Sequence, residues 1–132
     1  MPDVGAAGVS ETSAAPYDCA VTIEQDLERA RHLAFAADEG TAKELLLSLM
    51  PRIEEADRDD MMLEVYAQLG EIYLVRTAYD GVTECLKRIR DCLRRYSEMP
   101  AADRMNTGID IDRMICRYTR RALFLQTGFA AA

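Results

Sequence analysis

The residues best able to do chemistry in this chain are its four cysteines and its single histidine: Cys19, Cys85, Cys92, Cys116 and His32. Cys85 and Cys92 are seven residues apart in a segment with helical periodicity, which separates their Cα atoms by roughly 10 Å, beyond disulfide reach. No Cys-x-x-Cys occurs, so the sequence predicts no metal site and no cofactor. Reduced thiols are expected, and only Cys116, flanked by arginines, has a case for redox sensing.

Carboxylates gather in the acidic run at residues 54–60. A calcium loop starting at Asp57 needs an oxygen ligand and a glycine where Met61 and Met62 stand, so the run is better explained as charge at the start of a helix. Glu28 precedes His32 by four residues and could touch it, but no nucleophile accompanies the pair. Because no known catalytic motif occurs either, we predict no catalytic residues and no enzyme.

Arginines form the sharpest charged pattern. Arg113, Arg117, Arg120 and Arg121 fall at i, i+4, i+7 and i+8, with Phe124 among them. The opposite face is apolar and consists of Ile111, Met114, Ile115, Tyr118, Ala122 and Leu125. The arginines could bind an acidic protein surface, a second copy of the chain or phosphates, or they could be a solvated face paired with nearby acids. A net charge of −7 makes nucleic acid the least favoured partner.

Charge is divided unevenly along the chain. Residues 1–75 carry a balance of −11 and residues 76–132 a balance of +4, so the two halves could attract each other within one molecule or between two copies. No apolar run approaches the ~20 residues that cross a bilayer, and the N-terminus lacks the pattern of a secretory signal. We therefore predict no membrane partner and a cytoplasmic location.

The apolar spacing predicts an all-α fold of about five helices. They are expected at residues 22–39, where Gly40 is the predicted stop, then at 41–53, 60–76, 80–96 and 109–126. Pro51 should kink or shorten the second helix, and one helical turn is expected after Pro100. The predicted organisation is a disordered leader at 1–18, a single domain at 19–128 and a tail at 129–132.

One stretch suggests how these helices are arranged. Tyr66, Leu69, Gly70 and Tyr73 share a helix, and Gly70 lets a second helix approach closely. A shift of 36 residues relates this helix and the next to weaker copies upstream, and all seven compared positions are small or apolar in both copies. The pattern resembles the tetratricopeptide repeat, a stack of helical hairpins, over residues 22–96.

The resemblance implies two stacked antiparallel hairpins, with the last helix as a cap, in a non-catalytic scaffold or adaptor that binds a protein or peptide. It implies a binding groove lined by Glu64, Ala67, Glu71, Leu74 and Val75. That acidic, aliphatic lining suits a basic or amphipathic helix, and the alternative is a solvated helix face. The carboxylate-binding clamp of some family members is not carried over, because acids stand in its place. Self-association or membership of a longer protein would cover the exposed ends of two repeats.

Two other functions stay open. A ligand-sensing or regulatory domain would have a closed cavity lined by Met50, Met62, Tyr66 and Tyr73. Nucleic-acid or anion binding would act through the arginines of the last helix, and its affinity would fall steeply with salt.

Overall fold

Six helices make up the part of the chain that the computed structural model describes, residues 19–131, and there is no strand within that range. They are α2 (Cys19–Phe35), α3 (Glu39–Glu55), α4 (Asp59–Val75), α5 (Tyr79–Ser97), α6 (Ala101–Asn106) and α7 (Ile111–Ala131). The predicted all-α class is confirmed, and α6 is the short helix expected after Pro100. The predicted leader at residues 1–18 lies outside the described residues.

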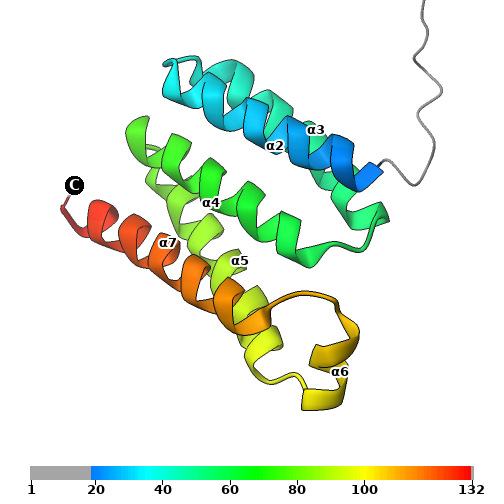
Figure 1. The fold of residues 1–132 in the computed structure, drawn as a ribbon. Helices are drawn as coiled ribbons and strands as arrows, with labels where there is room; N and C mark the ends of the chain where they lie inside the picture. Colours follow the sequence, from blue (N-terminus) through cyan, green and yellow to red (C-terminus); the bar gives the residue numbers. More distant parts are fainter. Residues whose placement is uncertain (1–18, 132) are drawn as a thin grey trace, which may run out of the picture.

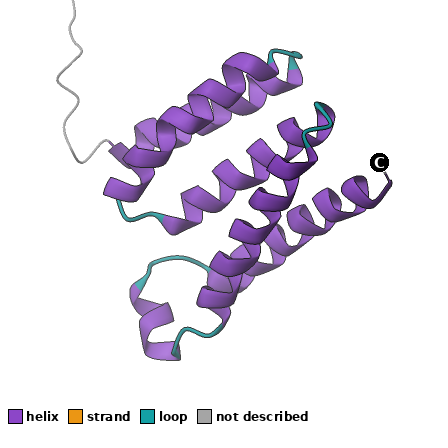
Figure 2. Ribbon diagram, turned by 180° about the vertical axis from the view of Figure 1, so that it is seen from behind, coloured by secondary structure: helices purple, strands orange, loops and turns teal. Residues whose placement is uncertain are grey.

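The helices pack as antiparallel neighbours in chain order. Figure 1 shows α2 and α3 as one hairpin, with α4 between that hairpin and α7. Helix α5 pairs with α4 and also packs against α7 (Figure 2), so α7 closes the open side of the second hairpin. None of the helices in the described range is long and apolar enough to cross a membrane.

Three turns of one kind join the first four helices. In each, the chain ends a helix and passes through a left-handed residue, at Ala37, Asp57 and Thr77, with φ between 55° and 66°. Backbone N–H groups reach back across each turn, as Asp38 does to the Leu33 carbonyl at 2.8 Å. This is the Schellman arrangement, which satisfies carbonyls at the helix end.

The first turn corrects the predicted helix boundaries. Helix α2 ends at Phe35, and Gly40, the predicted stop, is already inside α3. The N-cap of α3 is Asp38, whose carboxylate accepts from the Thr41 N–H at 3.4 Å, so the predicted cap at Thr41 is wrong. Thr22 likewise lies within α2, which begins at Cys19. The left-handed residues of these turns are not glycines, so the sequence contains no glycine that would mark the helix ends.

Neither Pro51 nor Gly128 ends the helix in which it lies. Helix α3 continues through Pro51 to Glu55, with the proline on its exposed side, so the predicted early end is wrong. Helix α7 continues through Gly128, where the sequence predicted a stop and a tail. A Cβ at Gly128 would lie 2.6 Å from Cδ2 of Leu74, so packing of α7 on α4 uses the missing side chain.

The hairpins repeat at 40 residues rather than at the predicted 36. Helices α2, α3 and α4 are each 17 residues long, and Ala37 and Thr77, which occupy the same place in two turns, are 40 residues apart. Buried positions match at this offset: Ile23 with Leu63, Ala30 with Gly70, Ala42 with Val82, Leu46 with Leu86, and Leu49 with Ile89. The two offsets differ by about one helical turn, which is why the shorter one still paired apolar positions.

Helix α4 belongs to both halves of the core. Leu63 and Ala67 pack with α5 and α7 in one cluster, whereas Val65, Leu69 and Ile72 pack with α2 and α3 in the other. Such burial on nearly every side is expected of a helix with neighbours on several sides.

Thr77→Gly is expected to raise the free energy of unfolding by about 1 kcal/mol. A β-branched residue at φ 56° is strained, and glycine removes that strain at a smaller entropic cost. Urea unfolding followed by helical circular dichroism measures the change. Thr83→Gly, at an exposed position inside α5, is the control and should destabilise by a similar amount. If both variants lowered the free energy of unfolding equally, Thr77 would not be strained in a left-handed conformation.

Candidate functional site

One strip of α4 lies between α2 and α7. Glu64, Gln68, Glu71 and Val75 follow one another at i, i+4, i+7 and i+11, so they share one face of the helix. All four line cavities whose other walls come from α2 and α7. We call this strip with its walls the α4 groove.

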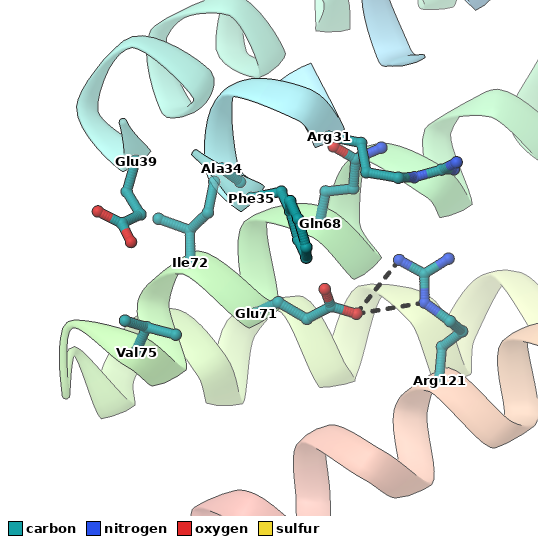
Figure 3. A pocket seen from close by; sticks show the side chains of 9 residues that line it. All are labelled: Arg31, Ala34, Phe35, Glu39, Gln68, Glu71, Ile72, Val75 and Arg121. Carbon is teal, nitrogen blue, oxygen red and sulfur yellow. Dashed lines mark hydrogen bonds and ion pairs between the residues drawn. The ribbon is translucent and has the colours of Figure 1, made fainter. Parts of the chain in front are cut away.

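At one end of the groove the helices leave a cavity of about 400 Å³, which we call the Phe35 pocket (Figure 3). Its lining residues are Arg31, Ala34, Phe35, Glu39, Gln68, Glu71, Ile72, Val75 and Arg121. Two of them are apolar and exposed: Phe35 is 94% and Val75 69% accessible. They are the last residues of α2 and α4 and stand 40 residues apart, so the repeat places an apolar side chain at the same end of both helices.

Three arginines surround Glu64 in the middle of the groove. Glu64 is only 6% exposed, and it pairs with Arg121 at 3.1 Å, Arg31 at 3.3 Å and Arg117 at 3.7 Å. Arg31 comes from α2 and the other two from α7, so one carboxylate ties three helices together. A buried carboxylate needs such partners, because desolvation of an unpaired charge is costly.

Two further hydrogen bonds complete the shell of Glu64. The Tyr118 hydroxyl donates to Oε1 at 2.7 Å, and Nε2 of Gln68 donates to Oε2 at 2.8 Å. Burial by itself raises the pKa of Glu64, but the Arg121 charge and the hydrogen bonds outweigh it and hold the pKa below its ordinary value. Burial and the neighbouring carboxylate raise the pKa of Tyr118, which remains a donor.

Gln68 carries the one buried side-chain oxygen or nitrogen in the described residues that has no hydrogen-bond partner, its Oε1 atom. Its Nε2 donates to the Leu27 carbonyl at 3.2 Å as well as to Glu64, and a flipped amide would set oxygen against both acceptors. The orientation is therefore fixed by its neighbours. A buried acceptor without a donor costs about 1–3 kcal/mol, and Gln68 lines the Phe35 pocket.

Two more carboxylates line the same pocket. Glu71 accepts a hydrogen bond from Nε of Arg121 at 3.3 Å, and Nη2 of Arg121 forms an ion pair with the same oxygen, Oε2, at 3.3 Å (Figure 3). Glu39 begins α3 and has no ion pair among the described residues. Glu39 is therefore the one carboxylate of the pocket lining without an ion pair among the described residues.

The predicted groove residues separate into two groups. Glu64, Glu71 and Val75 line the α4 groove, although Glu64 is buried under its arginines. Ala67 is fully buried, and Leu74 packs against α7 beside Gly128. The prediction that these last two line an open groove is wrong, because α7 covers that side of α4.

The predicted arginine stripe is divided in the same way. Arg121 is 22% exposed and Arg117 about half exposed, and both turn toward Glu64. Arg113 points outward beside Asp110 at 4.0 Å, and Arg120 and Phe124 are exposed. Arg113, Arg120 and Phe124 could therefore contact a partner without breaking the ion pairs and hydrogen bonds of Glu64, which we call the Glu64 network.

The cysteines and the histidine form no reactive group in the described residues. Burial raises the pKa of Cys85 to about 12 and that of Cys92 to about 11, so both remain thiols, while Cys116 is exposed. His32 is exposed and touches Glu28 at 3.3 Å, as its spacing predicted. No cluster of three or more potential metal ligands is found between residues 19 and 131.

The four-residue cavity expected of a ligand-sensing domain is not among the cavities described. Met62 and Tyr66 line an open, largely charged depression of about 440 Å³ on the α4–α5 side, without Met50 or Tyr73. Tyr73 instead packs on Gly81, where a Cβ would lie 2.6 Å from its ring.

Sequence reasoning missed Arg31, Phe35 and Gln68. Arg31 and Phe35 lie on α2 outside its apolar stripe, and Gln68 is a polar residue between the motif positions Tyr66 and Leu69. A 40-residue alignment would have paired Phe35 with Val75 and revealed the shared end of the two helices.

The sequence matches no protein-family model, and comparison with curated proteins and with solved structures finds no match either.

Proposed function

We propose that this chain is a non-catalytic protein-interaction module that holds a peptide or helix of a partner protein in the α4 groove. A tetratricopeptide-like stack of hairpins remains the proposed relation, with 40-residue hairpins in place of the usual shorter unit. In that family, binding is the usual role of a groove between successive helices.

The observation that carries the proposal is the end of the groove at Phe35 and Val75. Two large apolar side chains are exposed beside a cavity whose lining includes Gln68, the residue with the unpartnered buried oxygen. Exposed apolar side chains clustered at a concave, partly polar surface are typical of interaction sites. An extended peptide or a helix would cover the apolar pair and bring backbone or side-chain donors to Gln68.

Selection from phage-displayed 12-residue peptides tests the proposal. Peptides enriched on the wild-type protein should lose binding to a Phe35→Ala/Val75→Ala variant by at least tenfold. Both side chains are exposed, so the variant should fold, and its circular dichroism verifies this. The matched control, Leu47→Ala, changes an exposed apolar residue on α3 and should bind like wild type. Enriched peptides that bind both variants equally would place binding elsewhere and refute the proposal.

A further inference from the structure

We propose that the Phe35 pocket receives a lysine or arginine side chain of the partner. The inference rests on the proposed function and names the chemistry of the residue that enters the groove.

Charged side chains of both signs line the pocket: Arg31, Arg121, Glu39 and Glu71. Arg31 and Arg121 are paired with Glu64, and Arg121 is also paired with Glu71. Glu39 takes part in no ion pair among the described residues. A cation entering here can pair with the Glu39 carboxylate, whereas an anion would have to displace carboxylates from arginines.

Residues with unused hydrogen-bond acceptors line the same space. Oε1 of Gln68 has no donor although the residue is only 5% exposed. The two contacts from Arg121 to Glu71 both use Oε2, and no bond to Oε1 of Glu71 is present in the described residues. With Glu39, three residues that line the pocket have unused acceptors, and the carboxylates of Glu39 and Glu71 suit an ammonium or a guanidinium because these carry only donors.

The apolar walls suit the rest of such a side chain. Ala34, Ile72 and Val75 can cover an aliphatic stem, as lysine and arginine stems commonly are covered. The Phe35 ring is almost wholly accessible and can lie against the charged end. An apolar side chain would use these walls but leave the Gln68 acceptor without a donor.

Titration of the ¹⁵N-labelled full chain with single-residue probes tests the inference. The probes are the N-acetyl methylamides of arginine, lysine, norleucine and glutamate, and the reporters are the Gln68 side-chain amide and the Phe35 and Val75 backbone amides. Arginine or lysine should bind with a dissociation constant of a few mM, which corresponds to roughly −3 to −4 kcal/mol. Norleucine, which keeps the stem and lacks the charge, should bind at least fivefold more weakly.

Two variants separate the charge from the ring. Glu39→Gln should weaken the arginine probe at least threefold and leave norleucine unchanged, whereas Glu44→Gln, an exposed control on the same helix, should change neither. Phe35→Leu should also weaken arginine more than norleucine. Equal binding of norleucine, stronger binding of glutamate, or no shift at the reporters up to about 20 mM arginine would each overturn the inference.

The two proposals fail separately. If selected peptides need Phe35 and Val75 but contain no basic residue, the groove still binds partners and the choice of side chain is wrong. If the arginine probe binds at the reporters and no peptide is enriched, the pocket is a cation site and the interaction module is wrong.

Discussion

Glu64→Ala is expected to lower the free energy of unfolding by about 3 kcal/mol. The substitution removes the shared acceptor of Arg121, Tyr118 and Gln68, all of which are at least mostly buried. Breaking a buried pair by removing one partner typically costs about 3–5 kcal/mol. The lower end applies because Arg121 keeps Glu71 and because Arg31 and Arg117 can turn to solvent. Urea unfolding followed by circular dichroism measures the loss.

Glu64→Gln is the matched control. It keeps the shape and one carbonyl acceptor, so it should cost less than the alanine variant, with the difference reflecting unsatisfied donors. Glu28→Gln removes an exposed carboxylate that contacts the same Arg31 and should cost less than about 1 kcal/mol. If alanine at position 64 were as harmless as glutamine at position 28, the Glu64 network would not hold the three helices together.

The Glu64 network also predicts how stability changes with pH. The pKa of Glu64 in the folded protein lies below its ordinary value of 4.5, so the unfolded chain takes up the proton first as pH falls. The stabilisation is therefore fully present above about pH 5 and is lost as pH falls through the lowered pKa. Wild type should lose more stability than Glu64→Gln between pH 6 and pH 3, measured by urea midpoints at each pH.

Helix α5 shows what a local pattern can predict. Its apolar stripe, Val82 to Tyr96, is the stripe found buried, and its limits were predicted to within one residue. The pattern is strong because one face is wholly apolar and the other carries charges, so only one orientation hides the apolar side. The buried face of α7 was predicted for the same reason.

The turn at Ala37 shows where local pattern fails. Nothing about alanine indicates a left-handed conformation, and Gly40 three residues later offered a stronger stop signal. The helix was predicted to end four residues after Phe35, and the predicted 36-residue offset is likewise four residues shorter than the observed 40. At an offset of 36, Phe35 is not paired with Val75. The turn is set by packing of α2 on α3, which is tertiary information.

Glu64 shows why the groove was only half predicted. Its place on the α4 face was correct, but a helix face does not reveal which neighbour covers it. Arginines that looked like an outward stripe, Arg117 and Arg121, neutralise it from a helix 50 residues later in the chain. The sequence shows that the first part of the chain is acidic and the second part basic. It does not show which acidic residue pairs with which arginine, because that depends on the fold.

Leu125→Ala is expected to cost about 3 kcal/mol, because Leu125 is fully buried where α7 meets α4 and α5. Gly70→Ala is expected to cost about 1–2 kcal/mol, since a Cβ at Gly70 would lie 2.6 Å from Cδ1 and 3.3 Å from Cδ2 of Leu125. The sequence predicts that a second helix approaches Gly70. Cys85 of α5 does lie 3.4 Å away, but the closest approach comes from α7.

The double variant distinguishes this packing from two independent losses. With Leu125 shortened, the new methyl group at position 70 enters the space that the leucine vacated, so the cost of the pair should fall below the sum of the single costs by about 1 kcal/mol or more. Gly128→Ala is the control. Its new methyl group would meet Leu74 and not Leu125, so its cost should add to that of Leu125→Ala without coupling. Additive costs for Gly70→Ala and Leu125→Ala would mean that α7 does not rest on Gly70, and without that contact Arg121 would not reach Glu64 or Glu71 to wall the α4 groove.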